Sequence, residues 1–168
     1  MIRLEPFAEQ HLDLLGPLLA DPELQRFTRV PVPVPADFAR TWLGGYEDGR
    51  RTGTKEAFAI VDGGGDLLGL CMAPRIDSDT ATAELGYAVA PASRGKGVAT
   101  EALRLLTEWA FAELELHRLE LLISVDNVAS KRVAERCGYV KEGVLRSHYL
   151  KPGVRVDTEI WSRLATDP

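Results

Sequence analysis

The hydrophobic pattern of the N-terminal third predicts two helices separated by an extended loop. A short strand over 1–7 comes first, and leucines at helical spacing then predict a helix over 11–20, although Pro17 disfavours a helix interior. Residues 30–35 alternate valine with proline. Because proline fits neither a helix interior nor a central strand, this segment is predicted to be an extended surface loop. A second helix is expected from about 37 to 50.

In the middle of the chain the apolar residues recur with a period of two, as in a β-strand. Apolar runs at 57–61 and 67–72 flank the turn Asp62-Gly63-Gly64-Gly65-Asp66, which predicts a β-hairpin. A further strand is expected over 80–89. The three consecutive glycines lie between two strands with no helix after them, so they are interpreted as a hairpin tip and not as a phosphate site.

The C-terminal half alternates helices with strands. A long amphipathic helix is predicted from Val98, then a strand over 119–125, a short helix over 127–137, and strands over 139–145 and 154–164. The order of elements predicts one α+β domain over 1–168. Its sheet of about six or seven strands is expected to be mostly antiparallel, with one parallel crossover and about four flanking helices.

Composition narrows the function classes. The chain has 168 residues, 45% of them hydrophobic and 27% charged, with a net charge of −5. These values fit one globular domain. No segment is densely basic, which argues against a nucleic-acid partner. No apolar run reaches the roughly 18–20 residues of a membrane helix. The two cysteines and three histidines lack metal-ligand spacing, so we expect no metal and a cytoplasmic protein with reduced thiols.

The most informative segment is the loop 92–97, between the strand that ends before Pro91 and the long helix. The first backbone N–H groups of a helix are free and carry partial positive charge, which suits a phosphate. Gly95 and Gly97 would let the backbone approach an anion closely, and Arg94 and Lys96 add positive charge.

Several interpretations of this loop compete. A P-loop requires Ser or Thr after the lysine, and here Gly97 follows Lys96. The dinucleotide fingerprint G-x-G-x-x-G is incomplete, since Thr100 stands at its third glycine, and the loop follows a run of hairpins. A glycine-rich loop that only turns a corner remains an alternative.

The surrounding motifs resemble the GNAT acetyltransferase superfamily, most closely the RimJ/RimL branch that acetylates ribosomal-protein N-termini. The resemblance covers about residues 84–164. It rests on Leu85-Gly86-Tyr87, Pro91, Arg94-x-x-Gly97-x-Ala99, Thr100-Glu101-Ala102-Leu103, Asn127-x-x-Ser130, Cys137-Gly138-Tyr139, Glu142-Gly143, Leu145-Arg146 and Asp157. It implies the GNAT fold and acetyl-CoA as co-substrate.

The resemblance also implies which residues bind the coenzyme. The strand before the loop is expected to splay from its neighbour, so that the pantetheine arm pairs with exposed backbone. This would involve Tyr87, Ala88 and Val89, with a backbone N–H near Val89 polarising the thioester carbonyl. Asn127 would bond the pantetheine amide, or cap a helix, or do both. The pyrophosphate would lie on Arg94, Gly95, Lys96, Gly97, Val98, Ala99 and Thr100.

The predicted catalytic residues are Glu84 and Ser130. In many GNAT relatives a tyrosine acts as the general acid that protonates the leaving thiolate, and this chain has Ala134 at that position. The resemblance to the RimJ/RimL branch implies that Ser130 takes this role instead. Ser130 could instead be a plain helix-surface residue. Glu84 is the expected base for the acceptor amine, with an ordinary exposed carboxylate as the alternative. Glu101 is less favoured because it lies in the first turn of the phosphate-binding helix.

The resemblance predicts direct transfer of acetyl to a primary amine in a ternary complex, most closely to a protein N-terminal α-amine. No cysteine lies near Glu84 or in the loop to form an acyl-enzyme. The alternatives are an acetyltransferase for a small amine or antibiotic, a non-catalytic acyl-CoA sensor, and a nucleotide-binding oxidoreductase. The protein is expected to be a monomer or a homodimer.

Overall fold

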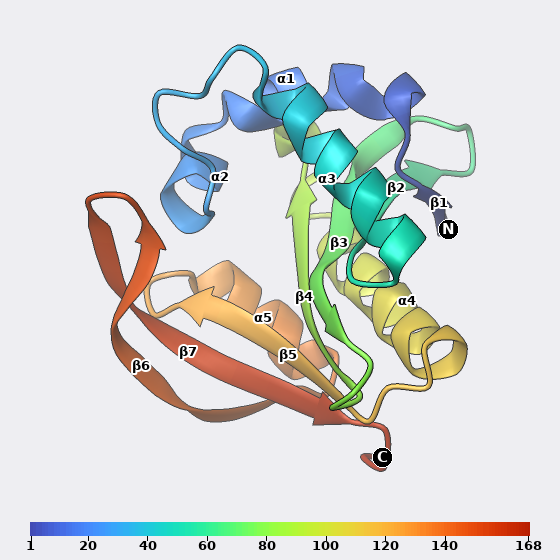
Figure 1. Ribbon diagram of the computed structural model, residues 1–168, viewed down its shortest axis with the longest axis vertical. Helices are drawn as coiled ribbons and strands as arrows, with labels where there is room; N and C mark the ends of the chain where they lie inside the picture. The colour runs from blue at the N-terminus through green and yellow to red at the C-terminus, as the bar shows by residue number, and fades with distance from the viewer.

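A seven-stranded sheet in the order β1-β2-β3-β4-β5-β7-β6 forms the centre of the protein. The computed structural model describes residues 1–168 (Figure 1). Neighbouring strands are antiparallel except for β4 and β5, which run parallel. The strands are β1 Ile2–Pro6, β2 Glu56–Asp62, β3 Leu67–Asp77, β4 Thr82–Val89, β5 Arg118–Ser124, β6 Val140–Lys151 and β7 Val154–Leu164.

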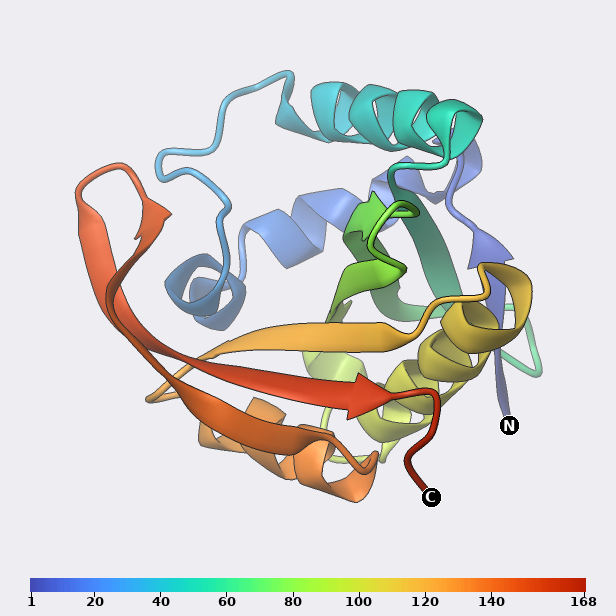
Figure 2. The same cartoon turned by 60° about the horizontal axis from the view of Figure 1, so that its bottom comes forward.

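Helices cover both faces of this sheet, with the N-terminal helices on one face and α4 and α5 on the other (Figures 1 and 2). The single parallel crossover runs from β4 through α4 to β5. The predicted α+β fold is therefore confirmed. The helices are η1 Glu9–His11, α1 Leu12–Leu19, α2 Pro22–Phe27, α3 Phe38–Thr52, η2 Pro91–Ser93, α4 Val98–Glu113 and α5 Val128–Arg136.

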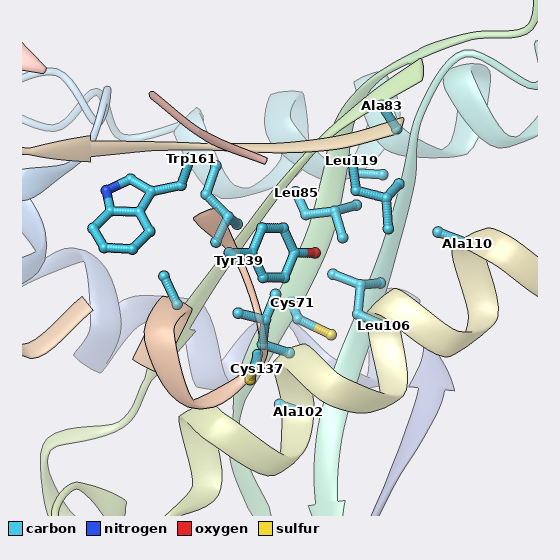
Figure 3. Close-up of a cluster of buried hydrophobic side chains, with 14 of the residues drawn as sticks. Cys71, Ala83, Leu85, Ala102, Leu106, Ala110, Leu119, Cys137, Tyr139 and Trp161 are labelled. Carbon is cyan, nitrogen blue, oxygen red and sulfur yellow. The ribbon is translucent and has the colours of Figure 1, made fainter. Parts of the chain in front are cut away.

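The larger core lies between the sheet and helices α4 and α5. Alternate residues of β4 and β5 point into it, as expected for strands with one face on a core (Figure 3). Leu85, Leu103, Leu106 and Leu119 are almost completely buried there. A second cluster, which includes Phe7, packs α1 and α3 onto the opposite face. Two cores thus hold β4 from both sides and fix its position.

Three segments differ from the sequence predictions. Helix α2 was not predicted, although Asp21 caps its N-terminus by accepting the Leu24 N–H and a proline follows at the first helical position. Pro17 lies inside α1 without ending it. Strand β6 continues to Lys151 instead of ending near 145, because its irregular second half still pairs with β7 through register shifts. No helix in the structure is both long and apolar enough to cross a membrane.

The feature that positions the site is the divergence of β4 from β5. The two strands pair only from Thr82 to Glu84 on β4 and from Arg118 to Glu120 on β5, and then separate (Figure 1). The other edge of β4 stays paired with β3 as far as Val89. Beyond Glu84 the edge of β4 that faces β5 therefore has no strand partner, and we call the region between the two diverging strands, up to the loop before α4, the opening.

Candidate active site

The loop before α4 presents a series of free backbone donors. Gly95 and Gly97 have φ angles of 73° and 81°, the left-handed region that glycine adopts at little cost. The N–H groups of Gly95, Lys96 and Gly97 find no acceptor in the protein, and neither do those of the first turn of α4. Six consecutive N–H groups, from residue 95 to residue 100, are therefore available to an anion. This arrangement suits a diphosphate.

The Arg94 side chain points away from these donors, towards α2. Its Nη2 lies 2.5 Å from Asp21 Oδ2, its Nη1 3.0 Å from Glu23 Oε2, and its Nε 3.1 Å from the Val89 carbonyl oxygen. Hydrogen bonds from the guanidinium hold the pKa of Asp21 below its ordinary value. Lys96 Nζ donates to the Ala92 carbonyl at 2.9 Å. In this structure the anion site consists mainly of backbone, with Arg94 connecting the loop to α2.

The free edge of β4 faces the opening. The Ala90 N–H donates to Leu68 O of the β3 side at 2.8 Å. Because alternate residues of an antiparallel strand bond the same neighbour, Val89 and Tyr87 direct their backbone groups the other way, into the opening. Ala88 pairs with Leu70 and faces β3. Of the three residues predicted on β4, Tyr87 and Val89 direct backbone groups towards this side, and the Val89 carbonyl already accepts a hydrogen bond from Arg94 Nε.

Asn127 and Ser130 are joined by a helix cap on the other wall of the opening. Asn127 Oδ1 accepts the Ser130 N–H at 3.2 Å, so Asn127 caps α5. This bond leaves the Asn127 amide NH₂ without a protein partner and the Ser130 hydroxyl unused by the cap. The Tyr87 hydroxyl is buried and lies close enough to Ser130 for the serine to lower its pKa, although no hydrogen bond of good geometry joins the two side chains. Burial raises the pKa of Tyr87 to about 12 and keeps it protonated.

Glu84 lies at the last paired position of β4, where the strands begin to separate. Its side chain is 13% exposed, and its Oε1 lies 3.0 Å from Nη2 of Arg29. Tyr46 of α3 lies on the same side, where burial, and secondly the negative charge of Glu84, raise the pKa of its hydroxyl. Glu84 is thus a largely enclosed carboxylate with one cationic partner, consistent with a group that can accept a proton.

The remaining candidates are directed elsewhere. Glu101 Oε1 accepts the Ile2 N–H at 3.3 Å, so its carboxylate faces β1 and not the loop. Cys71 and Cys137 are both buried, and burial raises the pKa of each thiol. Thiols held protonated in this way are weak nucleophiles. These positions agree with a site that has no cysteine nucleophile.

The structure brings the predicted residues to one opening but from two sides. Ser130 and the Tyr87 side chain lie on the α5 side, whereas Glu84 lies on the α3 side because it is three residues from Tyr87 on the alternating strand. Sequence reasoning missed Arg29 and Tyr46. Tyr46 lies within the helix expected from about 37 to 50, where nothing distinguishes it from its neighbours. Nothing in the local sequence marks Arg29 as a partner of a carboxylate 55 positions away.

Comparison with known proteins gives one family. The family described as Acetyltransferase (GNAT) domain matches residues 2–140. The ribosomal-protein-serine acetyltransferase of Escherichia coli is 30% identical over 99 residues, 59% of this chain and 55% of that protein. The spermidine N(1)-acetyltransferase of Vibrio cholerae is also 30% identical, over 96 residues, 57% of this chain and 56% of that one. The chain thus spans about half the length of such relatives in these alignments.

A solved structure confirms the fold. RimL, the ribosomal L7/L12 alpha-N-protein acetyltransferase in complex with coenzyme A, superposes with a TM-score of 0.88. The match covers 97% of this chain and 93% of that chain, at 23% sequence identity. The topology is therefore shared over almost the whole of both chains.

Proposed function

This chain belongs to the GNAT acetyltransferase family, and from that premise we propose that it transfers the acetyl group of acetyl-CoA to a primary amine, most specifically the N-terminal α-amine of a protein or peptide. The observation that carries the proposal is the presence of free backbone groups on two successive segments, the edge of β4 and the start of α4. Six unpartnered N–H groups at the start of α4 are followed by the open edge of β4, which leads to the enclosed carboxylate of Glu84.

In this proposal the loop and β4 hold the co-substrate. The N–H groups from Gly95 to Thr100 bind the pyrophosphate, with the α4 dipole adding to the attraction. The exposed backbone of Tyr87 and Val89 pairs with the pantetheine arm, as an added strand would. The free NH₂ of Asn127 donates to a pantetheine carbonyl. The Val89 N–H is then directed at the thioester carbonyl, where it stabilises the charge that develops on oxygen.

Glu84 is proposed as the base. An α-amine has a pKa of about 8 and a lysine amine of about 10.4, so either acceptor arrives mostly as the ammonium at neutral pH. Glu84 can take the excess proton directly or through one water. Its position at the start of the divergence places the carboxylate on the α3 side, opposite Ser130. The acceptor is therefore expected to enter from the α3 side.

Ser130 is proposed to orient or protonate the leaving thiolate. Ala134 stands where many relatives carry a tyrosine acid, so the hydroxyl must come from another residue. The Ser130 hydroxyl is available because the cap uses only its N–H. With both thiols buried and protonated, direct attack of the amine on the thioester is the simplest chemistry for this set of residues.

A small-amine acceptor is the second candidate, supported by the equal 30% identity to the spermidine and the ribosomal-protein enzymes. The experiment that tests the proposal measures thiol release from acetyl-CoA with peptides that begin with Ala or Ser, and with spermidine and other small amines. Fastest release with peptides supports an N-terminal acceptor. Release only with small amines supports the second candidate. No release with any amine, despite acetyl-CoA binding, would identify a sensor.

A further inference from the structure

A row of charged side chains crosses the sheet on its α3 side, next to the proposed acceptor entrance. Arg75 of β3, Glu84 of β4 and Glu120 of β5 occupy opposite positions in the strand register. Residues opposite one another in register direct their side chains to the same face of a sheet. Arg118 lies two positions before Glu120 and joins the row to Glu142 of β6. An acceptor entering from this side meets these charges first.

Every carboxylate in this row already has an arginine partner. Glu120 Oε2 lies 3.1 Å from Arg75 and its Oε1 2.9 Å from Arg118. Glu142 lies 2.7 Å from Arg118. Glu84 pairs with Arg29 at 3.0 Å. Three carboxylates are thus balanced by three arginines, and the row offers no unpaired carboxylate for the second ammonium of a polyamine.

Two arginines of this row, Arg29 and Arg75, each have only Nη2 bonded, and Arg29 is the one of the two that is paired with Glu84. Its side chain is 54% exposed, whereas Glu84 is 13% exposed. Only Nη2 is bonded, to Glu84, so Nε and Nη1 have no partner in the protein. A guanidinium with two free donor directions beside a carboxylate can receive a second anion in bidentate geometry.

The segment that carries Arg29 is held in place by its neighbours. Thr28 Oγ1 donates to Leu24 O at 2.6 Å and accepts the Val30 N–H at 3.3 Å. Lys151, a buried lysine at the end of β6, donates to the Val30 carbonyl at 3.2 Å and to the Gln25 carbonyl, and has no carboxylate partner. Its uncompensated charge adds to that of Arg29 on the same segment.

We propose that the acceptor is a peptide N-terminus with an acidic side chain among its first residues, and that Arg29 binds this acidic group while Glu84 receives the amine. This rests on the proposed acetyltransferase function. The Arg29–Glu84 pair exchanges partners: the ammonium replaces the guanidinium at Glu84, and the acceptor carboxylate replaces Glu84 at the guanidinium. Both charges stay balanced. A polycation could replace the guanidinium at Glu84, but it has no carboxylate to replace Glu84 at the guanidinium. Arg29 would then face further positive charge.

The test compares kcat/KM for two amidated peptides that begin Ser-Asp and Ser-Lys and are otherwise identical, with spermidine as a third acceptor. The wild-type protein is expected to favour the Ser-Asp peptide about tenfold in kcat/KM. This ratio combines a partly exposed ion pair between Arg29 and the aspartate of one peptide with the repulsion between Arg29 and the lysine of the other. Arg29→Gln should reduce the ratio towards one, and Arg29→Glu should invert it. Arg51→Glu, an exposed charge reversal at the far end of α3, is the matched control and should keep the wild-type ratio.

The affinity for acetyl-CoA, measured by calorimetry, should be the same in the wild type and the three variants. Equal affinity would show that the variants are folded. Equal use of the two peptides by the wild type would overturn the inference, as would a ratio that Arg29→Glu leaves unchanged or a preference for spermidine. Failure of the proposed function gives a different result, in which acetyl-CoA binds but no peptide or amine releases thiol.

Discussion

At the scale of single residues, the proposed chemistry depends on groups that have few partners. Glu84 has one partner, and the Ser130 hydroxyl and the Asn127 amide NH₂ have no strong protein partner. The buried Tyr87 hydroxyl beside Ser130 also lacks a partner of good geometry, and since most buried polar groups in folded proteins are satisfied, this region is expected to bind something. The opening between β4 and β5 gathers several of them.

Glu84→Gln tests the base. The amide cannot accept the ammonium proton, so kcat is expected to fall about a hundredfold, within the usual range for a lost general base. The remaining activity should rise with pH as free amine becomes more abundant, which moves the optimum upward. The pH profile of kcat for variant and wild type checks this. A wild-type profile in the variant would remove Glu84 from the role.

Ser130→Ala tests the thiolate partner without disturbing the helix. The cap uses the Ser130 N–H, which alanine keeps, so stability and the KM for acetyl-CoA should change little. The loss of a hydroxyl that orients or protonates the leaving thiolate is expected to lower kcat about tenfold to a hundredfold. Asn127→Ala is the contrasting variant, because it should weaken both the cap and coenzyme affinity. If Ser130→Ala turned over at the wild-type rate, the serine would be only a surface residue of α5.

How much of the site was predictable from sequence differed from residue to residue. Gly95 and Gly97 were identifiable because a helix start preceded by glycines has a defined backbone geometry. The direction of the Arg94 side chain was not, since its partners Asp21 and Glu23 belong to a helix that the sequence did not reveal. Arg29 was invisible for the same reason: ion pairs between distant segments leave no local pattern.

At the scale of elements, Arg94 connects α2 to the loop before α4 through its ion pairs with Asp21 and Glu23. Asp21→Asn isolates this connection, because asparagine is as good a helix cap as aspartate but lacks the charge. Losing this partly buried ion pair should lower the free energy of unfolding by about 1 kcal/mol. Denaturant unfolding of Asp21→Asn and Asp21→Ala, which also removes the cap, measures the two contributions separately. Equal stability of wild type and Asp21→Asn would show that the connection contributes nothing.

Strands β5 and β6 are connected across β7 by Arg118 and Glu142, and this pair should make stability depend on pH. Hydrogen bonds from Arg118, and from Ser162, lower the pKa of Glu142 to about 2 in the folded protein. A carboxyl with a depressed folded pKa stabilises the fold above its unfolded pKa of about 4.3, and this contribution is lost as pH falls towards 2. Because Glu142 is partly exposed, the effect should be small, about 1 kcal/mol or less. Thermal unfolding at several pH values between 5 and 2 checks this. The Tm of Glu142→Gln should fall less with decreasing pH than that of the wild type, and an equal fall in both proteins would contradict this assignment.

Elements with a regular period were predicted well, and irregular ones were not. The strong apolar faces of α4 and β5 identified both, and the hairpin of β2 and β3 followed from alternation around a glycine turn. Helix α2 has six residues, too few for its period to be visible, and only its Asp21 cap and following proline marked it. Strand β6 is exposed at most of its positions, so its second half is defined by pairing with β7 and not by an alternation of buried and exposed residues.

At the scale of the whole molecule, topology creates the site. Because β4 and β5 are parallel and joined by α4, the start of α4 necessarily lies beyond the end of β4, where the two strands have separated. The free N–H groups at the start of α4 and the open edge of β4 are thus consequences of one crossover. Helices α1–α3 cover one face of the sheet and α5 lies on the other (Figure 2), and these are the faces to which the proposal assigns the acceptor and the leaving thiolate.

The central claim is that this loop and strand edge hold the coenzyme, with the thioester next to Val89. The most direct measurement is a titration of ¹⁵N-labelled protein with CoA, followed through its amide signals. We predict the largest changes at Gly95, Gly97 and the following first turn of α4, together with Tyr87 and Val89 on β4. Saturable CoA binding that leaves these signals in place and moves those of another surface would contradict the claim.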